Sequence, residues 1–162
     1  MENPPDSSSA SGRPCLLIAE DTPFKRSYLE EAVSVAARHV DVRCCERVDE
    51  TIEFLLQHAH EVVFALVDYS FTCEGKTGIE IIRALRTANR YCYIMLVTST
   101  DIRATEFKVR EAAARLAGAN EAISMNMLPH LAGDWIDATL RDLQREGKLG
   151  FPKGSPEHSI ED

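Results

Sequence analysis

Several features are scarce in this sequence of 162 residues, and each absence narrows the class of protein. No apolar run approaches the roughly 20 residues that span a bilayer, so we expect no membrane-embedded segment. The 18 Lys and Arg residues are outnumbered by 26 Asp and Glu residues, and the net charge of -8 argues against nucleic acid or an anionic membrane as partner. Residues 1–13 lack the basic start and apolar stretch of a signal peptide, which predicts a cytoplasmic protein.

Cysteine is present without the spacing of a metal site or a redox motif. The five cysteines form no C-x-x-C pair and none of the usual zinc patterns. Four of them lie in strand-like runs, where free cysteine behaves as a small hydrophobe: Cys15, Cys44, Cys45 and Cys92. We therefore predict reduced structural thiols, and Cys73, in a polar loop, is the one position to test for reactivity.

The composition divides the chain into one domain and two tails. Residues 1–13 are rich in Pro and Ser, and residues 147–162 contain Gly and Pro without periodicity, so we expect a disordered N-terminal tail and a flexible C-terminal tail. Residues 14–146 alternate short apolar runs with longer amphipathic ones, which predicts a single domain of ordinary size.

Periodicity predicts five strands and five helices in strict alternation. The expected strands are 15–19, 41–46, 62–68, 91–98 and 121–125, and the expected helices are 22–40, 49–59, 78–88, 101–118 and 129–146. Thr22 and Pro23 fit the start of the first helix, and Gly118 fits the end of the fourth. On the fourth helix an apolar stripe is expected from Ile102, Thr105, Val109, Ala112 and Leu116. This alternation implies an α/β fold whose parallel sheet is covered on both faces.

Carboxylates follow two of the buried strands. The first strand runs into Glu20 and Asp21, the third ends at Asp68, and the fourth ends at Thr98. If the first and third strands are neighbours, three carboxylates meet at the sheet edge where such folds bind ligands. Their repulsion would be relieved by a hard divalent cation such as Mg²⁺. The simpler alternative is that each carboxylate only caps the turn that follows its strand.

Four motifs of the chain resemble one known family. These are "LLIAEDTPFKR", "VVFALVDYSF", "GIEIIRALR" and "YIMLVTST", and with them residues 14–146 resemble the receiver domains of two-component response regulators. The separation of 30 residues between Asp68 and Thr98 is typical of that family, and Gly78 falls near its usual glycine. The resemblance implies a flavodoxin-like, doubly wound (βα)5 fold with strand order 2-1-3-4-5.

The resemblance also implies a role for each residue at the sheet edge. Asp68 matches the aspartate that accepts a phosphoryl group, and Thr98 matches the hydroxyl residue that contacts this group. Glu20 and Asp21 match the acidic pair that binds Mg²⁺, with Asp21 as the direct ligand. Ser70 would give the metal its backbone carbonyl oxygen. The chain would then be a stand-alone signalling protein rather than an enzyme.

The fifth strand departs from the family pattern. Receivers end it with Lys-Pro, and the alignment puts Met125 and Asn126 at these two positions. Methionine cannot donate a charge-assisted hydrogen bond. The family's aromatic switch residue falls on Ala122. Lys76 is a candidate substitute cation, and Arg103 and His130 are weaker candidates.

Two functional classes therefore remain open, and a third class is less favoured. The intact carboxylates favour a phosphorylatable receiver, and the missing Lys and aromatic residue favour a pseudo-receiver that docks to proteins without phosphorylation. A metal-dependent hydrolase would need an acid or base beside Asp68, where only Tyr69 and Ser70 are close in sequence.

The expected partners follow from the resemblance. A histidine kinase or a phosphotransfer protein would supply the phosphoryl group, and a downstream protein would read it. The surface of the fourth and fifth helices is where such a partner, or a second copy of the chain, would bind. Trp135 in the fifth helix belongs either to this surface or to the core.

Overall fold

A computed structural model describes residues 14–34, 40–127, 138–139, 141–142 and 145. Its elements are β1 (Cys15–Ala19), α1 (Pro23–Ala32), β2 (Asp41–Cys45), α2 (Val48–His58), the short 3-10 helix η2 (Ala59–Glu61), β3 (Val62–Asp68), β4 (Ser70–Phe71), β5 (Lys76–Thr77), α3 (Ile79–Ala88), β6 (Tyr93–Thr98), α4 (Thr105–Ala117), β7 (Glu121–Ser124) and the 3-10 helix η3 (Met125–Met127). Both predicted tails, and most of the predicted last helix with Trp135, lie outside the described residues.

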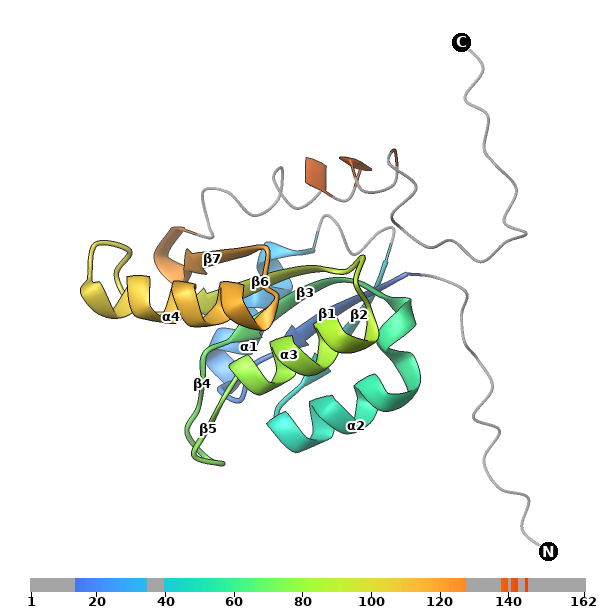
Figure 1. Ribbon diagram of the computed structural model, residues 1–162, viewed down its shortest axis with the longest axis horizontal. Coiled ribbons are helices and arrows are strands. Elements are labelled where there is room, and N and C mark those ends of the chain that lie inside the picture. The colour runs from blue at the N-terminus through green and yellow to red at the C-terminus, as the bar shows by residue number, and fades with distance from the viewer. Residues whose placement is uncertain (1–13, 35–39, 128–137, 140, 143–144, 146–162) are drawn as a thin grey trace, which may run out of the picture.

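The five main strands form one parallel sheet (Figure 1), in the order β2-β1-β3-β6-β7. Because β6 and β7 are the fourth and fifth predicted strands, the predicted order 2-1-3-4-5 is confirmed. Every residue of β1 and β3 is buried, as the unbroken apolar runs indicated. The sheet therefore has its most apolar strands at its centre.

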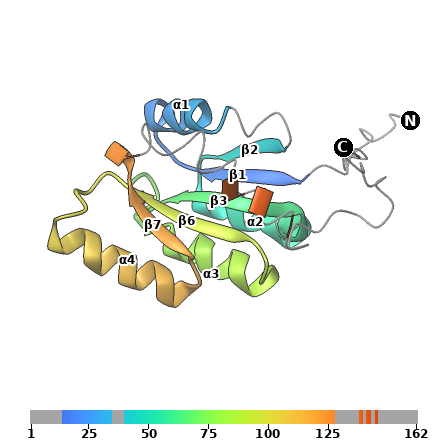
Figure 2. The ribbon, with the colours of Figure 1, turned by 90° about the horizontal axis from the view of Figure 1, so that it is seen from above.

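Helices cover both faces of this sheet (Figure 2), with α1 on one face and α2, α3 and α4 on the other. Alternate residues of β1 enter two separate cores. Leu16 and Ile18 pack with Leu29 of α1, whereas Leu17 and Ala19 belong to the cluster that includes Leu85 of α3. The period of two in a strand thus serves both layers of helices.

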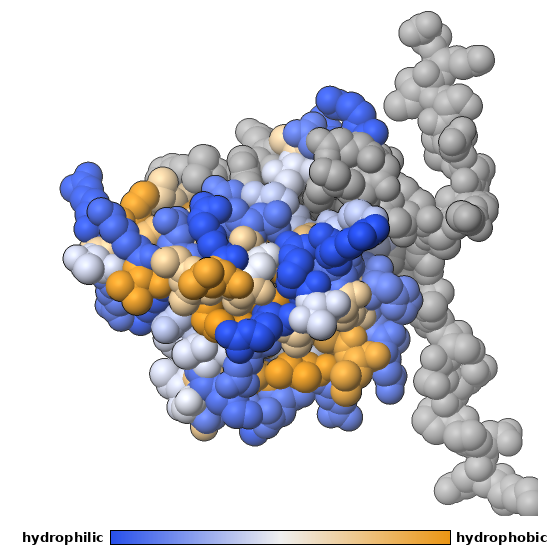
Figure 3. Space-filling model, viewed as in Figure 1, coloured by the Kyte–Doolittle hydropathy of each residue, from blue (hydrophilic) through white to orange (hydrophobic). Residues whose placement is uncertain are grey.

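Two predicted helices differ from the structure. The helix expected over 22–40 ends at Ala32, because Val33, with φ -96° and ψ 3°, leaves helical geometry; residues 35–39 of the predicted helix lie outside the described residues. The apolar stripe predicted for α4 was assigned to the wrong face. Phe107 and Ala114 are its buried residues, whereas Val109 is 63% and Leu116 91% exposed. Apolar side chains accordingly show on the surface over α4 (Figure 3).

The loop that follows β3 contains structure that the sequence did not predict. Ser70–Phe71 and Lys76–Thr77 pair as a small antiparallel hairpin, and its turn includes Gly75 with a φ of 61°. Phe71 is fully buried, so its apolar side chain anchors the hairpin to the domain. In the described part of the chain, no helix is both long and apolar enough to cross a bilayer.

Candidate functional site

Three carboxylates meet at the carboxyl ends of β1 and β3. These strands are neighbours, with Ala19 opposite Val67, so Glu20, Asp21 and Asp68 are brought to one edge. One oxygen from each carboxylate lies within 4.8 Å of the others. Glu20 and Asp68 are buried and Asp21 is half-buried. The convergence expected from the strand-ending residues is therefore present in the fold.

Two oxygens of this cluster are buried without a partner. Glu20 Oε2 and Asp68 Oδ2 accept no hydrogen bond from the described residues, whereas Glu20 Oε1 accepts one from the backbone N–H of Thr22 at 3.0 Å. Burial raises the pKa of both the Glu20 and the Asp68 carboxyl groups, and the charge of Asp68 raises that of Glu20 further. Buried, unpaired carboxylate oxygens are costly. An all-oxygen donor set of this kind fits Mg²⁺.

Thr98 lies beside Asp68 at the end of the next strand. Asp68 is in register with Val97, so Thr98 extends one residue beyond it, and its side chain is buried. Its hydroxyl donates to Thr100 Oγ1 at 3.1 Å. The fold thus places Thr98 at the same edge of the sheet as Asp68, and contact of its hydroxyl with a phosphoryl group stays a prediction.

Gly78 is required by the close approach of its backbone to Asp68. A Cβ atom at this position would lie 2.0 Å from the Asp68 carbonyl oxygen and 2.7 Å from Val67 Cγ1. The Gly78 N–H also donates to the Tyr69 carbonyl oxygen at 2.8 Å. Gly78 therefore fixes the chain that follows Asp68. Ser70 lies within this loop, paired with Thr77, and a role for its carbonyl oxygen as metal ligand stays a prediction.

Arg110 of α4 also reaches this edge of the sheet. Its Nη1 donates to Thr98 Oγ1 at 2.8 Å and to Thr100 Oγ1 at 2.9 Å. Its Nη2 pairs with Glu106 Oε1 at 2.6 Å. The guanidinium carbon lies 4.2 Å from the centre of the Tyr69 ring. The side chain is only 17% exposed, so its guanidinium is held against Thr98 and Tyr69 at this edge of the sheet.

Several solved structures that are similar to this chain are receiver domains. A receiver domain protein from Clostridium thermocellum is similar with a TM-score of 0.64 and 14% identity, covering 84% of this chain and 98% of its own. A CheY-like receiver from Methanospirillum hungatei has a TM-score of 0.62 and 17% identity, with 83% and 99% covered. This chain has the receiver fold.

A third similar structure is a response regulator from Burkholderia pseudomallei, described with a phosphorylated aspartic acid, a calcium ion and citrate. Its TM-score is 0.55 and its identity 17%, over 82% of this chain and 74% of its own. No protein-family description matches the chain, and no curated protein matches it. At these low identities the similarity establishes the receiver fold.

No cationic side chain directly follows β7, the last described strand, where the family has its Lys. Met125 follows β7 directly, its side chain packs against the α1-side core, and its carbonyl oxygen accepts from the Tyr28 hydroxyl at 3.5 Å. Ala122 is half-buried against the other core. Neither residue supplies the charge or the aromatic ring that the resemblance led us to look for.

The substitute cations considered from the sequence are placed elsewhere. Lys76 Nζ pairs with Asp49 Oδ1 at 2.6 Å in an exposed ion pair that also lowers the pKa of Asp49. The Arg103 side chain lines a hollow beside the site, and His130 lies outside the described residues. Lys76 is therefore engaged away from Asp68.

Two cations that the sequence reasoning missed lie closer to the site. Lys25 of α1 is half-buried, and its charge lowers the pKa of both Asp68 and Glu20, partly offsetting their burial. The position of Lys25, one turn beyond the acidic pair, was a signal that could have found it. Arg110 had no such signal, since 42 residues separate it from Asp68 and only the packing of α4 brings it near.

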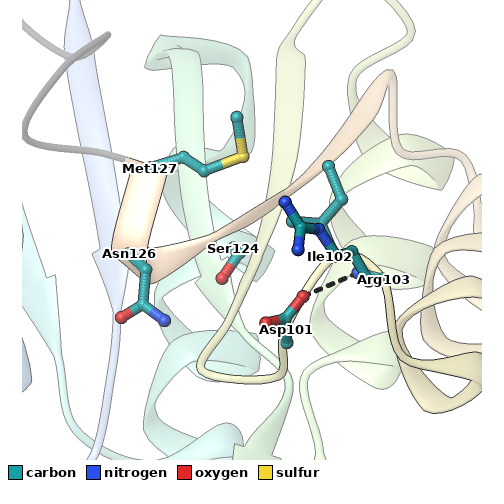
Figure 4. Close-up of a pocket in the computed structure, with 6 residues that line it drawn as sticks. All are labelled: Asp101, Ile102, Arg103, Ser124, Asn126 and Met127. Carbon is teal, nitrogen blue, oxygen red and sulfur yellow. Dashed lines mark hydrogen bonds between the residues drawn. The ribbon is translucent and has the colours of Figure 1, made fainter.

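A hollow of about 480 Å³ adjoins this edge, between the β6–α4 loop and the end of β7 (Figure 4). It is lined by Asp101, Ile102, Arg103, Ser124, Asn126 and Met127. The Asp101 carboxylate accepts from the Arg103 backbone N–H at 2.8 Å, which folds the loop around the hollow. The Ser124 hydroxyl is buried and has no partner among the described residues. The loop that carries the residues after Thr98 thus has open space on one side.

Proposed function

We propose that this chain is a response regulator receiver that accepts a phosphoryl group on Asp68, with Mg²⁺ as cofactor, and signals through protein–protein contacts. The observation that carries the proposal is the convergence of Glu20, Asp21 and Asp68 with two buried oxygens left unpartnered. Capping alone would not account for these oxygens, because a capping carboxylate uses its oxygens on backbone N–H groups.

Each residue then has a chemical task. Glu20, Asp21 and Asp68 would hold Mg²⁺, which when bound neutralises charge on the transferring phosphoryl oxygens. An oxygen of the ionised Asp68 carboxylate forms a bond to phosphorus while the bond from phosphorus to the donor breaks, and the donor atom keeps that electron pair. Thr98 donates its hydroxyl to an oxygen of the transferred group. The product is an acyl phosphate on Asp68.

The donor and the reader are proteins in this proposal. A histidine kinase or a phosphotransfer protein would present the phosphoryl group at the open edge of the sheet. A downstream protein would bind the modified domain. The exposed apolar residues Val109 and Leu116 make the α4 side a reasonable contact surface for it.

The second candidate function is that of a pseudo-receiver that docks to proteins independently of phosphorylation. Met125 and Ala122 favour it, because the residues that would report phosphorylation are absent from these two positions. In that case the carboxylates would be a remnant of the fold, and changing them would leave partner binding unaltered.

Mass spectrometry after incubation with acetyl phosphate tests the proposal. We expect the wild type to gain the mass of one phosphoryl group when Mg²⁺ is present and none when it is chelated. Asp68→Asn should gain nothing, while the control Asp49→Asn, which removes an exposed carboxylate outside the site, should react like wild type. A wild type that stays unmodified under all conditions would favour the pseudo-receiver.

A further inference from the structure

Arg110 connects the candidate acceptor site to the first turn of α4. One guanidinium nitrogen bonds the hydroxyl groups of Thr98 and Thr100, and the other pairs with Glu106, four residues earlier in the helix. Glu106 is 62% exposed, whereas Arg110 is mostly buried. One guanidinium nitrogen of Arg110 therefore bonds residues beside the candidate site, and the other pairs with a carboxylate at the surface.

The guanidinium of Arg110 contacts two residues that neighbour Asp68, one in the chain and one on the adjacent strand. Tyr69 follows Asp68 in the chain, and the guanidinium lies over its ring at 4.2 Å. Thr98 follows the register partner of Asp68 on the neighbouring strand. Stacking on a ring and bonding to the hydroxyl groups of buried Thr98 and half-buried Thr100 fix the plane of the guanidinium, which lowers the entropy lost when it binds an anion.

We propose that Arg110 is the residue that transmits phosphorylation of Asp68 to α4, by giving up its ion pair with Glu106 for the phosphoryl group while it keeps its hydrogen bond to Thr98. This inference rests on the proposed function. Arg110 contacts the transferred phosphoryl group beside Thr98 and takes the place of the cation that Met125 cannot supply. Lys76 is held by Asp49, so it does not compete for this role. Lys25, the other cation that acts on Asp68, lies on α1 and so does not connect the site to α4.

The ion pair of Arg110 with Glu106 is weaker than the interaction that Arg110 can make with a phosphoryl group. The pair with Glu106 joins residues four apart on a helix with an exposed carboxylate, and such pairs are weak. A phosphoryl group adds negative charge and acceptor oxygens in the buried part of the site, where charge-assisted hydrogen bonds are stronger. Phosphorylation therefore shifts Arg110 inward and leaves Glu106 unpaired.

A shift of Arg110 can change the surface of α4. The segment between Thr98 and α4 borders the hollow of about 480 Å³, which leaves this segment room to move. Val109, beside Arg110 in the chain, is exposed on the surface of α4. A change in the first turn of α4 therefore alters a surface that a partner protein can contact.

Beryllofluoride, which mimics the phosphoryl group on aspartate, provides the test when it is titrated calorimetrically at fixed Mg²⁺. Arg110→Gln should bind it roughly tenfold to a hundredfold more weakly, as loss of a charge-assisted hydrogen bond predicts. Glu106→Gln should bind it about twofold more tightly, because Arg110 is then free. The controls Lys108→Gln and Glu111→Gln change the same charges on the same helix and should bind like wild type. Arg110→Lys should recover part of the affinity.

Hydrogen exchange over the first turn of α4 provides the second readout. Beryllofluoride should change exchange there in the wild type and in Lys108→Gln, and leave it unchanged in Arg110→Gln. If Arg110→Gln is phosphorylated, binds beryllofluoride and changes exchange as wild type does, the inference is wrong and the proposed function stands. If the wild type neither binds beryllofluoride nor becomes phosphorylated, the proposed function itself fails. The opposite signs expected for Arg110→Gln and Glu106→Gln separate signalling from a merely structural role.

Discussion

Replacing Asp68 by Asn should stabilise the metal-free protein. The Asp68 side chain is buried with one oxygen unpartnered, and burial raises the pKa of its carboxyl group from 3.8 to about 6. Each unit of such a shift corresponds to about 1.4 kcal/mol, so the ionised group costs the fold about 3 kcal/mol at pH 8. Repulsion between two charges within 4.8 Å of one another, at an effective dielectric constant near 20, is of the same size, at about 3 kcal/mol or more. An amide of the same shape avoids this cost.

The pH dependence of this gain has a defined sign. Since the folded state binds the Asp68 proton more tightly than the unfolded chain, the wild type loses stability as pH rises through the raised pKa. The advantage of Asp68→Asn should therefore be about 2–3 kcal/mol at pH 8, shrink below pH 6, and vanish below pH 4, where both states hold the proton. Roughly 5–10 °C in Tm corresponds to this gain for a domain of this size.

Thermal and urea unfolding in the presence of a chelator measure the effect directly. Adding Mg²⁺ should stabilise the wild type and not the variant, because the variant has lost a ligand. Asp49→Asn is the control, since Lys76 lowers the pKa of Asp49 and its removal should bring no gain at pH 8. The reasoning is refuted if Asp68→Asn is less stable than wild type at pH 8 without metal.

Three further predictions concern the same edge of the sheet and the core beneath it. Mg²⁺ affinity, measured by calorimetry, should fall from pH 8 to pH 6, because burial raises the pKa of Glu20 and Asp68 and protons then compete with the metal. An affinity that does not change over this range would contradict this. Gly78→Ala should lower the free energy of unfolding by about 1–3 kcal/mol through a clash with the Asp68 carbonyl oxygen, and a neutral result in urea unfolding would disprove the clash. Gly75→Ala should lower the free energy of unfolding by about 1 kcal/mol through its positive φ. Phe64→Ala should cost about 3–5 kcal/mol in the same assay, since this ring is fully buried, and a loss below 1 kcal/mol would show that the core refills the cavity.

The sheet was predictable because its strands are read from unbroken apolar runs. Val62 to Asp68 is a strand from the first residue to the last, as predicted, since seven apolar or strand-ending residues leave no competing helical pattern. The same rule located the acidic cluster, because strand ends in a parallel sheet share one edge. Sequence reasoning was most successful where burial alone decides the structure.

What the sequence did not reveal depends on contacts between distant segments. The helical period found α4, but it could not choose which stripe is buried, and the face with Phe107 and Ala114 packs inward instead of the face with Leu116. The hairpin after Asp68 depends on burial of Phe71 and on a two-residue pairing too short to leave a pattern. Arg110 reaches Thr98 only because α4 lies against β6, and no local motif marks it.

The central claim is that Asp68 carries the phosphoryl group, and locating the modified residue tests it most directly. After reaction with acetyl phosphate and Mg²⁺, reduction with borohydride converts an acyl phosphate of aspartate into homoserine, which peptide mass spectrometry locates. We expect homoserine at position 68, and none when Mg²⁺ is chelated or when Asp68 is replaced by Asn. Homoserine at any other aspartate, or none under any condition, would contradict the account.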